Sequence, residues 1–185
     1  KSQIVFMLGY AALVRGILEV GFGFNILQIS RRIGRGQMDH VMIQPQPIWM
    51  ILLTEGFLPV SGTMSLFTGT GIMIWAMSMI TLPAISGWWL WFVVSLLSSS
   101  AIVLALTFLW GSLAFWSPVG AEEISSQATR FVFQLNPFPL DAVGPLVMNT
   151  LMTVLPIGFV AWYPCQALLG LQPHPLWKTP LVAVV

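Results

Sequence analysis

The chain has 185 residues, of which 57% are hydrophobic and only 7% are charged, and its formal net charge is +1. Because a typical soluble domain carries about 25% charged residues, this chain has too few charges to cover a water-facing surface. The composition therefore excludes soluble, nucleic-acid-binding and disordered proteins and indicates a membrane protein.

Long uncharged stretches separate the few charges. No Asp, Glu, Lys or Arg occurs between Glu55 and Glu122 or between Asp141 and Lys178. A membrane crossing needs about 20 apolar residues in a helix, and continuous apolar runs such as residues 88–97 do not show the alternation of membrane strands. We therefore expect an all-α, polytopic transmembrane helical bundle, with about four full spans, an interfacial helix and the start of another span.

The first predicted span covers residues 4–29 and contains Arg15 and Glu19. These side chains are spaced i, i+4, so their opposite charges can neutralise each other on one helix face. Two interpretations stay open: a structural ion pair buried against a neighbouring helix, or a polar element on a translocation path.

The segment after this span, residues 30–48, carries a basic cap and a potential short helix. The cap predicts a cytoplasmic location, because positive residues beside a span stay inside, and the first span then runs from outside to inside. Gly36, a helix-compatible run over residues 38–43, and Pro45 follow. Taken alone, the segment fits an ordinary solvated loop. The arginines of the cap are Arg31, Arg32 and Arg35.

The next apolar stretch, residues 48–82, is longer than one straight crossing needs. It is slightly too short for two crossings with a turn between them. We expect one tilted or broken helix, with a re-entrant pair that breaks near residues 69–71 as the alternative. Glu55 lies near the cytoplasmic end of this stretch and can reach the interface by snorkelling, or it can serve as an intramembrane polar group.

Residues 88–116 form the clearest predicted span. Tryptophans cluster at both ends, and Trp91 and Trp110 are separated by about 28 Å of helix, which matches the two aromatic belts of a membrane protein. Residues 117–141 then predict a cytoplasmic interfacial helix followed by a Pro-rich connection. Residues 142–163 predict a further span, and the apolar run from Leu181 predicts the start of another, so we expect the interior of a longer chain, truncated at both ends.

The chain lacks the motifs of several enzyme classes. A phosphate-binding loop needs a Lys after a Gly-rich turn, and the only lysines are Lys1 and Lys178. His40 and His174 are far apart in the sequence, and Cys165 has no neighbouring Cys or His at metal-ligand spacing. We predict no catalytic, metal or cofactor site in this chain.

Four segments together resemble a known family of bacterial ABC-2 type permeases, the membrane subunits of ATP-driven exporters. The sequence GQMDHVMIQP of residues 36–45 resembles that family's cytoplasmic G-[ED]-L-D-x-L-L-L-R-P signature. Gln37 and Gln44 depart from the usual acidic residue and Arg. The other three segments follow in the family's order: Phe115–Trp116, NPFPL at 136–140 and LPIGFVAWYP at 155–164.

The resemblance implies a single permease domain over residues 1–185, spanning the family's second span to the start of its sixth. The 30–48 segment is then similar to a coupling loop that contacts a separate ATP-binding cassette subunit through Gly36, Met38, Asp39 and Pro45. ATP and Mg would bind that partner, and a second permease subunit would complete the pathway.

The resulting prediction is a multi-pass protein of a bacterial plasma (inner) membrane, in contact with lipid and not with nucleic acid, that exports a hydrophobic or amphipathic substrate. Two alternatives from other classes stay open. One is a membrane-embedded enzyme that acts on lipid, and the other is a structural membrane scaffold. A lipid enzyme needs several catalytic polar groups at one interface, whereas the candidates here are dispersed.

Overall fold

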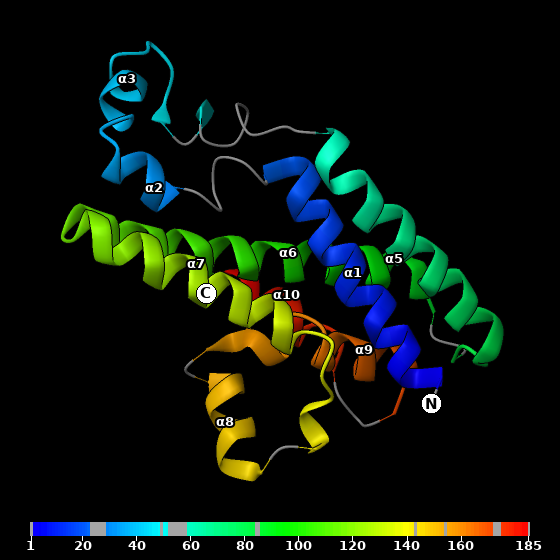
Figure 1. Ribbon diagram of the computed structural model, residues 1–185. Coiled ribbons are helices and arrows are strands. Elements are labelled where there is room, and N and C mark those ends of the chain that lie inside the picture. Colours follow the sequence, from blue (N-terminus) through cyan, green and yellow to red (C-terminus); the bar gives the residue numbers. More distant parts are fainter. Residues whose placement is uncertain are drawn as a thin grey trace.

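The computed structural model describes residues 2–22, 29–48, 50–51, 59–83, 86–142, 144–153, 155–171 and 175–184. Within these ranges every regular element is a helix, which confirms the all-α prediction. Figure 1 shows the order of the helices. They are α1 (Ser2–Phe22), α2 (Ile29–Gly34), α3 (Met38–Met42), α5 (Pro59–Met79), α6 (Trp88–Ser112), η1 (Leu113–Phe115), α7 (Pro118–Leu135), η2 (Leu140–Ala142), α8 (Pro145–Thr153), η3 (Pro156–Phe159), α9 (Trp162–Leu169) and α10 (Lys178–Val184).

Among the described residues, two helices are long and apolar enough to cross a membrane: α1, and α6 with its extension η1. The pair formed by α8 and η3–α9 gives a third candidate if it is one broken span. α5 is as long as α1, at 21 residues, but it is not among these candidate spans. The residues that the structure describes thus contain two to three candidate spans, against about four full spans expected from the sequence.

Four glycines bring α1 and α5 into close antiparallel contact. A Cβ on Gly9 would lie 2.9 Å from the backbone N of Met73, and a Cβ on Gly69 would lie 2.8 Å from that of Leu13. Gly16 and Gly62 are equally crowded, so small residues let the two backbones approach, as is common between membrane helices. α5 is continuous through residues 69–71, and the alternative of a re-entrant break there is therefore wrong.

A buried polar contact and an aromatic cluster join α1 to α6. The hydroxyls of Tyr10 and Ser99 are 2.9 Å apart and share a hydrogen bond. The Tyr10 ring packs edge-on against Phe92, with ring centroids 6.0 Å apart. At the start of α6, the indole N–H of Trp88 donates to the carbonyl of Leu168 in α9. These contacts place α1, α6 and α9 around one core.

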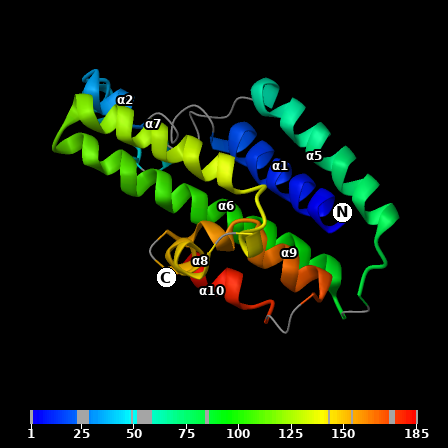
Figure 2. The same cartoon turned by 60° about the horizontal axis from the view of Figure 1, so that its bottom comes forward.

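α7 follows the predicted helix closely and ends before Pro137. It packs along α6, as Figures 1 and 2 both show, and runs from the end of the bundle near α2 toward the end where α1 begins. Pro139 and Asp141, just beyond α7, line a cavity together with Gln3 and Met7 of α1. Residues 117–141 therefore connect opposite ends of the bundle.

The span expected over residues 142–163 is not one continuous helix: the region is divided into α8, η3 and α9, and the pair of helices bends by 74°, so it remains a candidate as one broken span. Leu155 has an extended backbone, as is usual for the residue before a proline, and Pro156 cannot donate a helical hydrogen bond. Gly158 then fits tightly against the side chains of Met152 and Leu140. The proline breaks the helix and the glycine lets the broken ends pack.

Candidate functional site: the 30–48 segment

α2 attaches the base of the 30–48 segment to the bundle. It contacts α6, η1 and α7. The guanidinium Nε of Arg31 lies 3.5 Å from Oε1 of Glu122 on α7, and both side chains are nearly half exposed. Such an exposed pair contributes little to stability, about 0–1 kcal/mol, but its position shows that α7 is the neighbour of this segment.

The end of α2 is a Schellman motif centred on Gly36. The Gln37 N–H donates to the Arg32 carbonyl, and the Gly36 N–H donates to the Ile33 carbonyl. Gly36 has φ of 68°, a left-handed conformation that is unfavourable for residues with a Cβ. This glycine reverses the chain between α2 and α3. The turn alone therefore explains why a glycine occupies this position, whether or not a partner binds there.

α3 confirms the predicted short helix and buries only some of the apolar residues in and next to it. Met38 and Val41 are buried, at 7% and 4% exposure. Met42 and Ile43 are 56% and 77% exposed, so the surface of α3 that is free to contact another molecule carries these two side chains. Asp39 lies in the first turn of α3 and is also exposed.

The remaining residues of the predicted site lie around this helix. Pro45 is exposed in the bend that follows α3. Arg32 and Arg35 lie at the C-terminal end of α2 with Arg31, and Arg35 is exposed. Two further apolar side chains, Ile48 and Met50, are exposed beyond the bend. The structure therefore brings the basic cap, Asp39 and an exposed apolar group into one segment.

The intramembrane pair predicted in the first span is present and has two more partners. Arg15 donates to Glu19 over 2.7 Å within α1. The other Glu19 oxygen accepts a hydrogen bond of 2.7 Å from Ser65 of α5, and the Arg15 guanidinium lies 5.5 Å from the ring centroid of Phe133 on α7. One ion pair thus contacts α1, α5 and α7. Glu55 lies outside the described residues.

Sequence reasoning missed several of these residues. Ser65 and Phe133 carry no signal of their own, because their contacts depend on how the helices pack. Met42 and Ile43 were part of the short predicted helix, but the pattern did not show which of its apolar residues stay exposed. A helical wheel anchored on the buried pair Met38 and Val41 separates Ile43, but it places Met42 next to Met38, so the exposure of Met42 depends on the tertiary packing.

Comparison with known proteins gives a family and no individual relative. The chain matches no curated protein and no solved structure. It matches the family described as "ABC-2 family transporter protein" over residues 1–185, the whole chain. Members of this family are membrane components of transporters and typically have no ATPase site of their own. With its helical candidate spans and its family match, this chain belongs to the ABC-2 family of transporter membrane proteins.

Proposed function

We propose that this chain is the permease subunit of an ATP-driven exporter in a bacterial plasma membrane. A separate ATP-binding subunit supplies the energy, and a second permease subunit, a copy or a relative, completes the pathway. The exported substrate is hydrophobic or amphipathic.

The single observation that carries this proposal is the form of the 30–48 segment. Its base is attached to α6 and α7, and its far end exposes Met42 and Ile43 beside Asp39. Exposed apolar side chains next to charges are typical of a surface that binds a partner protein. Because the base is attached to two long helices, a movement of α3 shifts these helices as well.

The Arg15–Glu19 pair extends this connection into the bundle. It contacts Ser65 on α5 and Phe133 on α7, so a shift of either helix relative to α1 changes its surroundings. Arg15 is more exposed than Glu19, at 55% against 22% of the side chain. In the assembled transporter we propose that Arg15 faces the pathway or the second permease subunit, since intramembrane charges seldom face lipid.

The test uses the full-length permease assembled with its ATP-binding subunit in lipid nanodiscs and in vesicles. Asp39→Arg and Ile43→Asp should reduce transport and the stimulation of ATP hydrolysis at least tenfold, with normal insertion and abundance. Phe138→Asp, an exposed apolar residue far from the segment, is the matched control. The permease alone should hydrolyse no ATP. Wild-type rates in both variants, and in Pro45→Ala, would show that the segment is an ordinary loop.

A further inference from the structure

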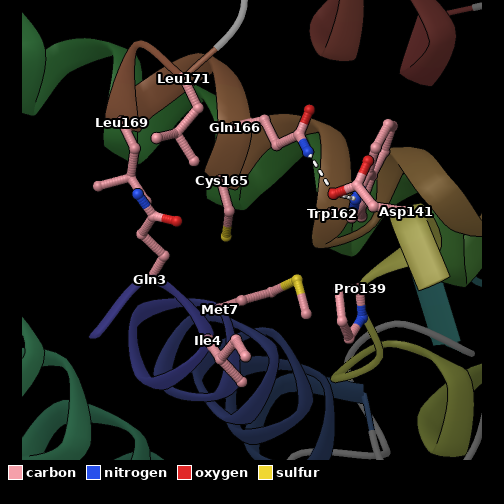
Figure 3. A pocket seen from close by; sticks show the side chains of 10 residues that line it. All are labelled: Gln3, Ile4, Met7, Pro139, Asp141, Trp162, Cys165, Gln166, Leu169 and Leu171. Carbon is pink, nitrogen blue, oxygen red and sulfur yellow. Dashed lines mark hydrogen bonds between the residues drawn. The ribbon is translucent and has the colours of Figure 1, made fainter. Parts of the chain in front are cut away.

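A cavity of about 230 Å³ lies at the end of the bundle where α1 begins, away from the 30–48 segment. Figure 3 shows its two walls, with Ile4 and Met7 of α1 on one side and residues of α9 on the other. The side chain of Cys165 points from α9 toward α1 across this space. The lining is mostly apolar.

Asp141 is the charged group of this cavity. One oxygen of its carboxylate accepts hydrogen bonds from the Trp162 indole N–H, over 3.3 Å, and from the Gln166 amide N–H, over 3.0 Å. Trp162 and Gln166 are one turn apart on α9, so both donors face the same carboxylate. This arrangement holds the carboxylate at the cavity, as the dashed lines in Figure 3 show.

No cation within the described ranges forms an ion pair with Asp141. Both of its hydrogen-bond donors are neutral, and Asp141 is exposed, so its carboxylate is open to a cation that enters the cavity. In addition, Oε1 of Gln166 is buried and has no hydrogen-bond partner within the described part of the chain. In Figure 3 this oxygen points away from α1, so the polar group that a ligand in the cavity meets is the carboxylate. A carboxylate beside an apolar lining favours a ligand that is positively charged, donates hydrogen bonds and carries an apolar chain.

We propose that this cavity binds an amphiphile with a primary ammonium group, such as an alkylammonium ion. The ammonium group pairs with Asp141, and the apolar chain lies between Ile4, Met7 and Leu171. The volume is below the range of about 300–1,000 Å³ usual for ligand pockets, so the site takes one slender chain and not a bulky ring system. This site does not depend on the ATP-binding partner.

Binding is measured on the full-length permease in zwitterionic nanodiscs, without nucleotide and without the ATP-binding subunit. The probes are decylammonium and the uncharged decanol, titrated calorimetrically, with empty nanodiscs as the baseline. Decylammonium should bind the protein at least tenfold more tightly than decanol. Asp141→Asn should remove this difference, and Glu123→Gln, an exposed carboxylate on α7, should keep it.

The location is tested with a cysteine at the rim. Cys165 is the only cysteine of the chain, so Cys165→Ala with Leu171→Cys carries a single reporter thiol. Decylammonium should slow its reaction with N-ethylmaleimide at least fivefold. Ile4→Trp, which fills the cavity, should abolish both binding and protection, which gives a second result should Asp141→Asn fold poorly. Equal binding of both probes would mean an apolar crevice only, and unprotected Leu171→Cys would place any binding elsewhere; either result overturns the proposal.

Discussion

Gly69→Ala tests the close contact between α1 and α5. The new Cβ would lie 2.8 Å from the backbone N of Leu13 and 3.0 Å from the carbonyl carbon of Ala12. Since carbon atoms pack at about 3.5–4.0 Å, the helices must separate by about 1 Å at this point. One turn away, the hydrogen bond of 2.7 Å from Ser65 to Glu19 would lengthen beyond the usual limit. Overpacking and the lost bond together predict a destabilisation of about 2–4 kcal/mol.

Gly71→Ala is the matched control, because a Cβ there meets no atom within 4 Å. It should leave the stability of the permease unchanged or raise it by at most about 1 kcal/mol, since alanine favours helix. The assay is unfolding of the full-length protein in mixed micelles with increasing denaturing detergent. In the Gly69→Ala background, Ser65→Ala should cost little more, because the bond is already lost. If Gly69→Ala and Gly71→Ala unfold alike, the helices do not pack at this separation.

Three further predictions concern other parts of the fold. Gly36→Val should destabilise the turn between α2 and α3 by about 1–2 kcal/mol, and Gly36→Asn by less, as measured by proteolysis of this segment; equal effects would contradict the left-handed turn. A double-mutant cycle on Arg31→Ala and Glu122→Ala should give a coupling below about 1 kcal/mol that falls with added salt, and a larger salt-independent value would argue for a buried pair. With Cys165→Ala, cysteines at Ser86 and Phe138 should react with a membrane-impermeant thiol reagent from the same side. Labelling from opposite sides would contradict this prediction and would fit the cytoplasmic interfacial placement of residues 117–141.

Local signals in the sequence predicted helix bounds well. The span expected at residues 88–116 is α6 with η1, Trp88–Phe115, because the aromatic belts mark both ends. The short helix expected at residues 38–43 is α3, Met38–Met42, because Gly36 and Pro45 limit it. Both predictions of helix bounds depend only on residues close to the helix end in the sequence. Helix bounds are predicted best where Gly, Pro or Trp lies near the end of the helix.

The break between α8 and α9 was harder to predict. Mean hydropathy is averaged over about 20 residues, so residues 142–163 give the value of one apolar span. The effect of the single residue Pro156 is lost in this average. Pro156 removes a hydrogen bond, but membrane helices often keep their direction through a proline. The bend is fixed by a contact distant in sequence, since Gly158 packs against Leu140, and no local pattern shows that contact.

α7 shows why the sequence predicted the helices near the candidate sites but not the contacts between them. Its periodic apolar residues predicted an interfacial helix, and Ile124 and Phe131 of the apolar face are exposed on the surface of the bundle. The face toward the bundle carries Ser125, Thr129 and Val132 instead. In water an apolar face is buried, but in lipid it can remain outside while small and polar residues make the helix contacts. The apolar pattern of α7 therefore predicts the helix but not its contacts through the polar face. Those contacts determine that α7 begins beside Arg31 and that the chain after it reaches the cavity at Asp141.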